Sequence, residues 1–219
     1  AYSFNQPINT WNMRNVTTTA SMFLNAYSFN QPLNNWTLTK NTDISAMFNN
    51  AYLFNQDLDS WYVANVTTML NTFSGAYSFN GSLNNWNTTK VNTMSGTFQN
   101  AYNFNRYVNH FSVYNVTTFA NMFTNARSFN QQLNNWTTIR STSFAAMLVG
   151  ANSFTQSITN FNISNSATAT IIPLITGGTN ITFVNYFNTV TSGNCTSQIK
   201  SCKFNNADLY LNNIASCQA

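Results

Sequence analysis

The chain repeats itself every 25 residues, and this period constrains its fold more than any other feature. A unit begins at an alanine seven times, without one insertion or deletion (Ala1, Ala26, Ala51, Ala76, Ala101, Ala126 and Ala151). Periods in this range are typical of proteins in which each unit buries its apolar face only by stacking on its neighbours. We therefore expect stacked coils, and we number the positions of a coil 1–25 from this alanine.

Two positions of the coil hold large aromatic residues in nearly every repeat. Position 4 is always phenylalanine (Phe4, Phe29, Phe54, Phe79, Phe104, Phe129 and Phe154). Position 11 is tryptophan in five repeats (Trp11, Trp36, Trp61, Trp86 and Trp136) and phenylalanine in Phe111 and Phe161. Position 8 is aliphatic throughout, from Ile8 to Ile158. We predict that these columns form the core, with each side chain packed on its counterpart in the next coil.

Each coil combines two apolar periodicities. Phe29, Gln31 and Leu33 are spaced two residues apart, as are the side chains on one face of a strand. Val16, Met22 and Phe23 recur at close to helical spacing. The pattern predicts an α/β solenoid. Each coil would contain a short strand of a parallel sheet, a tight turn carrying the tryptophan, and a short helical or 3₁₀ turn.

Charge is almost absent: charged residues make up 5% of the chain, and there is no glutamate. Equal positions of a stack lie about 5 Å apart, so like charges there would repel by about 1 kcal/mol even in water. Position 15 fits this restriction, because it carries a cation only in every second coil (Asn15, Lys40, Asn65, Lys90, Asn115, Arg140 and Asn165).

The net charge of +4 is thinly spread, so we expect no nucleic-acid partner. No apolar stretch is long enough for a membrane span.

The strings FNQPLNNWT, NVTTM and MFLNAYSFNQPL resemble the 25-residue surface-protein repeats of mycoplasma lipoproteins and of many protist and algal proteins, which are related to BspA-like leucine-rich repeats. The resemblance extends from Ala1 to about Ser164. It implies a right-handed, leucine-rich-repeat-like stack of seven coils on a cell surface, often adhesive and without known catalysis. It brings no catalytic residue, cofactor or metal. We predict a repeat domain over 1–165 and, where the pattern stops, a C-terminal cap over 166–219.

The cap contains all three cysteines (Cys195, Cys202 and Cys217). We expect one disulfide and one remaining thiol. Cys202–Cys217 and Cys195–Cys202 are both compatible with the sequence, and a bond that involves Cys202 is slightly favoured. Three reduced thiols in an intracellular protein are the alternative. A zinc site is not expected, since His110 is the only histidine and lies far along the chain.

Nine Asn-Xaa-Ser/Thr sequons are candidates for glycosylation (Asn15, Asn35, Asn65, Asn87, Asn115, Asn135, Asn162, Asn180 and Asn194). Asparagine, serine and threonine are so frequent that about this number arises by chance. Asn15, Asn65 and Asn115 nevertheless share one position in alternate coils, which would leave room for a glycan. We expect an extracellular, oxidised glycoprotein.

Two further columns are candidate contact surfaces. Tyrosine fills position 2 in the first five coils (Tyr2, Tyr27, Tyr52, Tyr77 and Tyr102), either as structural stacking or as a contact strip for sugar or protein. Threonine recurs at position 17 (Thr17, Thr42, Thr67, Thr117 and Thr142). Regular threonine columns suit ice binding, but the helical turn expected at this position argues against it.

Isolated polar residues give little support for catalysis. Asp57 and Asp59 could share a strand face about 7 Å apart, a separation compatible with an inverting glycosidase. Neither has an acidic counterpart in another coil, and nothing nearby would raise a pKa, so we expect no enzyme. His110 occupies a position otherwise held by Asn, Ser or Thr, which favours a surface substitution.

Two functions therefore compete. The first is a structural protein that self-associates head-to-tail into a fibre or surface layer; the face at Ala1–Trp11 would then be covered by residues 176–219 of another copy. The second is a cell-surface adhesin or carbohydrate-binding module, whose partners would be glycans or other surface proteins. An ice-binding stack is a minor alternative.

Overall fold

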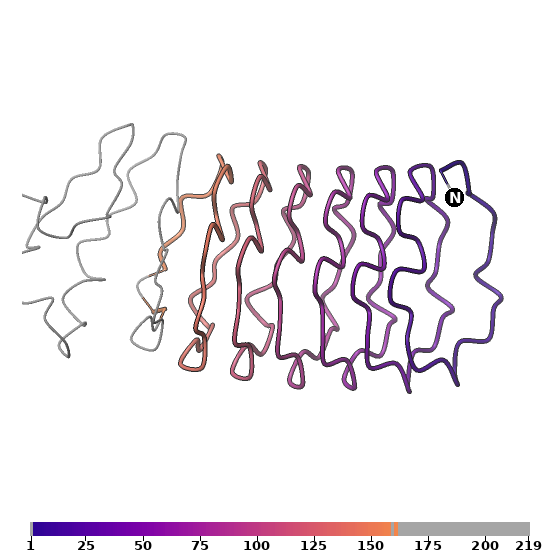
Figure 1. Ribbon diagram of the computed structural model, residues 1–219, viewed down its shortest axis with the longest axis horizontal. Helices are drawn as coiled ribbons and strands as arrows, with labels where there is room; N and C mark the ends of the chain where they lie inside the picture. Colours follow the sequence, from indigo (N-terminus) through magenta and orange to yellow (C-terminus); the bar gives the residue numbers. More distant parts are fainter. Residues whose placement is uncertain (1, 159, 162–219) are drawn as a thin grey trace, which may run out of the picture.

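The described residues form a row of similar coils, one for each 25-residue repeat (Figure 1). The computed structural model describes residues 2–158 and 160–161. From the N-terminal coil, drawn in indigo, each coil lies beside the next in sequence order until the orange end of the row. Isolated parallel bridges join residues 25 apart at position 18 (Thr18, Asp43, Thr68, Thr93, Thr118 and Ser143).

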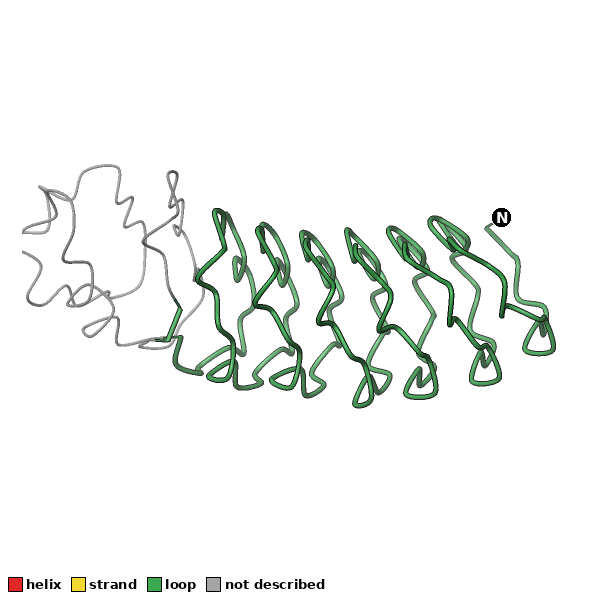
Figure 2. Cartoon of the chain, turned by 90° about the horizontal axis from the view of Figure 1, so that it is seen from below, coloured by secondary structure: helices red, strands yellow, loops and turns green. Residues whose placement is uncertain are grey.

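The expected α/β class is wrong. Within the described ranges there is no helix, and the only bridge residues are the isolated ones at position 18, so no sheet forms (Figure 2). In these ranges, neither the parallel sheet nor the helical turns of a right-handed, leucine-rich-repeat-like solenoid are present. Each coil consists instead of extended stretches and successive turns.

Asparagine side chains explain why the expected strands around position 4 do not pair as a sheet. The backbone N–H of position 5 donates to the side-chain Oδ1 of the asparagine one coil earlier, as from Asn55 to Asn30 at 2.9 Å. The same bond recurs from Asn30 to Asn5 and from Asn80 to Asn55. A side-chain oxygen thus takes the N–H that a strand would donate to a neighbouring carbonyl.

Left-handed backbone conformations explain why the expected helical turns are absent. Positions 21 and 25 have positive φ in every described coil that contains them (Ser21, Asn25, Ala46, Asn50, Asn71, Gly75, Gly96, Asn100, Asn121, Asn125, Ala146 and Gly150). An α-helix requires negative φ throughout, so two such residues within five interrupt it. Asparagine and glycine tolerate this conformation best, which accounts for the presence of one or the other at position 25 in each of these coils.

Alternating backbone hydrogen bonds replace the helix in this segment. Even positions close tight turns inside the coil, as from the N–H of Met47 to the carbonyl of Ile44 at 3.2 Å. Odd positions donate along the row, as from Phe48 to the carbonyl of Thr72 in the next coil at 2.8 Å. Over positions 19–25, each coil therefore donates to the next coil and accepts from the previous one.

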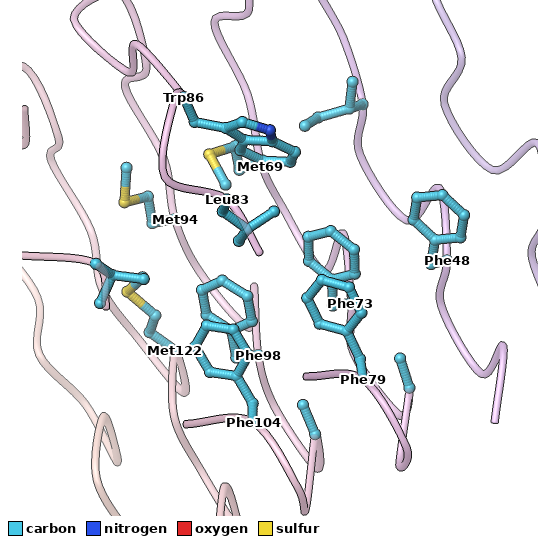
Figure 3. Close-up of a cluster of buried hydrophobic side chains, with 14 of the residues drawn as sticks. Phe48, Met69, Phe73, Phe79, Leu83, Trp86, Met94, Phe98, Phe104 and Met122 are labelled. Carbon is cyan, nitrogen blue, oxygen red and sulfur yellow. The ribbon is translucent and has the colours of Figure 1, made fainter. Parts of the chain in front are cut away.

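Stacked aromatic columns fill the core. At position 4, Phe29 and the later phenylalanines through Phe154 are buried, while Phe4 is partly buried. Each phenylalanine at position 23 also stacks on the one at position 4 in the following repeat, as Phe73 does on Phe79 at 4.0 Å (Figure 3). Trp11 is the exception among the tryptophans: it is 52% exposed, because only Trp36 on one side covers it.

The C-terminal cap predicted over 166–219 lies outside the described residues. The same holds for the predicted cysteine pairing and for the end of the predicted repeat domain beyond Phe161.

Candidate functional site

The tryptophan column binds one coil to the previous one through a single repeated hydrogen bond. The indole Nε1 of position 11 donates to the backbone carbonyl of position 8 one coil earlier, as from Trp86 to Leu58 at 2.9 Å. The bond recurs from Trp36, Trp61 and Trp136. Buried carbonyls need such a partner, so the tryptophans satisfy polar groups as well as fill volume.

His110 takes over this bond where position 11 has no indole. Phe111 replaces tryptophan in its coil, and the Nε2 of His110 lies 3.2 Å from the carbonyl oxygen of Leu83. In the seventh coil, Asn160 acts likewise beside Phe161, because its Nδ2 donates to Leu133 at 3.1 Å. The interpretation of His110 as a surface substitution is therefore wrong. The coincidence of a Trp→Phe change with a new donor at position 10 was the sequence signal.

The surroundings of His110 favour its neutral form. A carbonyl oxygen only accepts, so Nε2 carries the proton, and the buried Nδ1 has no hydrogen-bond partner. The ring stacks on Tyr107 and meets the edge of Phe111. Burial lowers the pKa of His110, while the Leu83 carbonyl and the charge of Asp59 act against that shift.

The two carboxylates considered for glycosidase chemistry, Asp57 and Asp59, accept hydrogen bonds from the backbone of the next coil. Asp57 accepts the N–H of Ser82 at 2.7 Å, and Asp59 accepts the N–H of Asn84 at 2.6 Å. Asp59 also accepts the hydroxyl of Ser82. Both acids thus accept backbone N–H groups of the next coil, as the asparagines at position 9 do from Asn9 and Asn109. Their geometry fits coil-to-coil bonding rather than acid–base chemistry.

The tyrosine column is a continuous stack. Ring centroids of successive tyrosines lie 4.8, 4.3, 4.5 and 4.6 Å apart from Tyr2 to Tyr102. The guanidinium of Arg127 continues the column 4.3 Å over the ring of Tyr102. Desolvation by the neighbouring rings and the hydroxyl of Tyr27 raise the pKa of Tyr52 to about 12. Because the faces of neighbouring rings cover one another, the column presents mainly ring edges at its surface.

The threonine column lies beside the bridge column and not in a helical turn. Thr17, Thr42, Thr67, Thr117 and Thr142 are exposed, and Asn92 interrupts the series. The hydroxyl of Thr67 donates to the backbone carbonyl of Thr42 at 3.1 Å. The helical placement that argued against ice binding is wrong, and ice binding itself stays an untested minor alternative.

Position 15 brings the cations of alternate coils into one column. Lys40, Lys90 and Arg140 are exposed. The Nζ of Lys90 donates to the Oδ1 of Asn65 in the preceding coil at 2.6 Å. Lys40 and Arg140 make the equivalent bonds to Asn15 and Asn115 at 2.9 and 3.1 Å.

Three predicted glycosylation sites share this column. The Nδ2 of Asn65 donates to the carbonyl of Thr39 at 2.8 Å, and that of Asn115 donates to Thr89 at 2.8 Å. These amide nitrogens therefore face the preceding coil. The sequons at Asn35, Asn87 and Asn135 are exposed. Those at Asn162, Asn180 and Asn194 lie outside the described residues, and glycosylation at all nine sequons stays a prediction.

Neither a metal cluster nor a membrane-spanning helix is found in the described part of the chain. No group of three or more His, Cys, Asp or Glu side chains gathers there. None of its segments forms a helix with the length and apolar character needed to cross a bilayer.

Comparison with known protein families gives one match, in two overlapping parts. The family model described as "Mycoplasma protein of unknown function, DUF285" matches residues 1–85 and 73–172. The resemblance of the repeats to mycoplasma repeat proteins is thereby confirmed. Searches of curated proteins and of solved structures give no match.

Proposed function

Because the chain belongs to the DUF285 family, which the match describes as Mycoplasma proteins of unknown function, we propose that it is a non-catalytic repeat protein of the cell surface or extracellular space. Its main role is structural, and copies associate end to end into fibres or a surface layer. Support comes from the uniformity of the coil-to-coil contact.

A recurring set of bonds joins successive described coils, with His110 and Asn160 replacing the tryptophan indole at two of the junctions. Odd positions from 19 to 25 donate backbone N–H groups to the next coil, and position 5 and position 11 donate to the previous one. One side of any coil is therefore complementary to the opposite side of any other coil. Such a contact between two copies is heterologous, and a heterologous contact that does not close on itself generates a filament.

Charge placed on the stacking face tests this proposal. Ile8→Arg puts a cation on a core position of the first coil, whereas Leu53→Arg puts the same charge on a side chain that is 53% exposed on the side of the row. We expect the parent and Leu53→Arg to form large species in light scattering and filaments in negative-stain electron microscopy. Ile8→Arg should lose both, while the fluorescence of the buried tryptophans shows that the later coils stay folded.

A parent protein that stays monomeric at every concentration would overturn end-to-end assembly. Loss of assembly in both variants would instead indicate association through the side of the row.

The second candidate is a surface binding module, an adhesin or glycan binder. One observation favours it: the exposed cations of position 15 stand in a straight column and are held by amides of the coil before.

A further inference from the structure

We propose that the cation column of position 15 is a docking rail for an extended acidic polysaccharide that carries one anionic group on every second sugar. The rail consists of Lys40, Lys90 and Arg140. The inference rests on the surface role proposed above, and it adds the class of ligand that the position-15 column would bind.

Spacing is the first support. The cations occupy every second coil, so successive charges lie about 10 Å apart, and the rail is about 20 Å long from Lys40 to Arg140. The repeat holds this interval fixed, because the bridges at position 18 join each coil to the next in register. In a polymer with an anion on alternate sugars, successive anions can each meet one cation of the rail, whereas a polymer with an anion on every sugar leaves about half of its charges without a cation.

The partners of the cations are the second support. Each cation nitrogen donates to the amide oxygen of an asparagine, at 2.6–3.1 Å, and not to a carboxylate. An amide fixes the position of the charge without neutralising it. Arg140 is oriented further, because its guanidinium lies 4.7 Å over the ring of Tyr114. A ligand therefore meets cations that are already ordered, which reduces the entropy lost on binding.

The absence of competing acids on this face is the third support. In the described residues, positions 12–17 contain no Asp or Glu. Asp57 and Asp59 lie at positions 7 and 9, where they accept backbone N–H groups of the next coil. Asp43, at position 18, is bonded to the N–H and the hydroxyl of Ser45. Within positions 12–17 the cations of the rail therefore have no acidic neighbour, and their positive charge attracts an anionic chain.

Hydroxyls flank the rail. Position 15 lies in a tight turn that is closed by position 16, as from the N–H of Asn41 to the carbonyl of Leu38 at 3.0 Å, and position 17 follows directly. Lys40 and Thr42 are both exposed, as are Arg140 and Thr142. The hydroxyl of Thr142 donates to the carbonyl of Thr117 at 3.1 Å, which leaves its oxygen lone pairs to accept from a ligand. Sugar hydroxyls are suitable donors, and the same arrangement recurs at Thr42, Thr67 and Thr117.

A nucleic acid fits these features less well. Duplex DNA carries one charge per about 1.7 Å of axis, far denser than the rail. Single strands are usually held by bases stacked on free aromatic faces. On the tyrosine column those faces are covered by neighbouring rings.

Binding of defined polymers to charge-matched variants tests the rail. The probes are hyaluronan, with a carboxylate on alternate sugars, polygalacturonate, with one on every sugar, neutral dextran and oligo(dT). The rail variant is Lys40→Asn/Lys90→Asn, which introduces the asparagine of the alternate coils. The control is Arg106→Gln/Arg127→Tyr, which removes two cations elsewhere and introduces residues found at those positions in other coils.

We expect the parent to bind hyaluronan more tightly than the other probes. Its Kd should rise about tenfold or more between about 50 and 200 mM salt, as contacts to a few anions predict. The rail variant should bind about tenfold more weakly and with a flatter salt dependence, whereas the control should bind like the parent.

Three outcomes would overturn the rail: no binding of hyaluronan, an equal loss in rail variant and control, or tighter binding of polygalacturonate or oligo(dT). Each leaves the structural proposal intact if Ile8→Arg still abolishes assembly. Conversely, a parent protein that stays monomeric but binds hyaluronan through the rail would refute end-to-end assembly and support the binding face.

Discussion

At the scale of the residue, position in a column decides how much a side chain stabilises the stack. Phe79 is fully buried between Phe54 and Phe104 and against Phe73. We expect Phe79→Ala to lower the free energy of unfolding by about 3–5 kcal/mol, the range for buried phenylalanine. Tyr77→Ala should cost much less, because Tyr77 is half-buried and part of its ring edge already meets water. Denaturant melts compare them, and equal losses would contradict the division into inner and outer columns.

His110 makes one junction sensitive to pH. Burial lowers its pKa, so below the ordinary value of about 6.5 the unfolded chain binds a proton that the folded chain does not. Stability from this group is present above that pH and is lost as the pH falls. We expect the urea midpoint of the parent to fall between about pH 7 and pH 5, before the carboxylates titrate.

His110→Asn is the matched control, because Asn160 makes the same carbonyl contact in the seventh coil without a titrating ring. Its midpoint should change less over the same pH range. A pH dependence identical in parent and variant would show that the histidine is not its source.

At the scale of the element, the coil depends on asparagine as an acceptor. The Oδ1 of Asn105 accepts the N–H of Asn130 and the Nε2 of Gln131, both at 2.9 Å. Asn105→Ala removes the oxygen that this exposed backbone N–H bonds, which should cost about 0.5–1.5 kcal/mol. Asn105→Asp keeps an oxygen in the same place and should cost less. Chemical denaturation measures both, and an Asp variant as unstable as the Ala variant would refute the acceptor role.

The same bonds show what the sequence could and could not predict about the coil. The period and the placing of Phe29 and Trp86 in apolar columns follow from repetition alone, since a residue that recurs at every coil meets its own copy. The choice between sheet and turns depends on whether the N–H at Asn55 goes to a carbonyl or to an amide oxygen, and hydrophobic periodicity does not distinguish these. The restriction of position 25 to Asn or Gly from the first to the sixth coil was a readable signal of positive φ.

The candidate site was predictable to a different degree. The alignment of Lys40, Lys90 and Arg140 can be read from the sequence, because residues at the same position of a 25-residue repeat lie in one column of the stack. The role of His110 was not deduced, because its partner is the backbone carbonyl of Leu83, 27 residues away. In neighbouring coils a tryptophan indole, not a histidine, bonds the equivalent carbonyl. Substitutions in a repeat protein are thus better interpreted in pairs, as Phe111 with His110, than one position at a time.

At the scale of the whole molecule, the row is joined only by contacts between neighbours, so a complete coil is a unit that can be removed. Deleting residues 51–75 joins Asn50 to Ala76 and preserves the order of positions. Deleting half a coil would instead shift the register of all following residues, so that no position would stack on its counterpart in the coil before the deletion. This follows from the additive, nearest-neighbour energetics of stacked repeats.

Removing that coil also changes the charge pattern in a defined way. The deletion of 51–75 puts Lys40 and Lys90 in adjacent coils and removes Asn65, the amide partner of Lys90. At about 5 Å, two like charges repel by about 1 kcal/mol in water, and salt screens the repulsion. We expect the urea midpoint of this variant to rise more steeply with salt than that of the parent. Adding Lys90→Asn to the deletion should remove the extra salt dependence, since an amide then stands beside Lys40. If the deletion variant responds to salt in the same way with Lys90 or with Asn at that position, repulsion between adjacent coils is not the reason that the cations alternate.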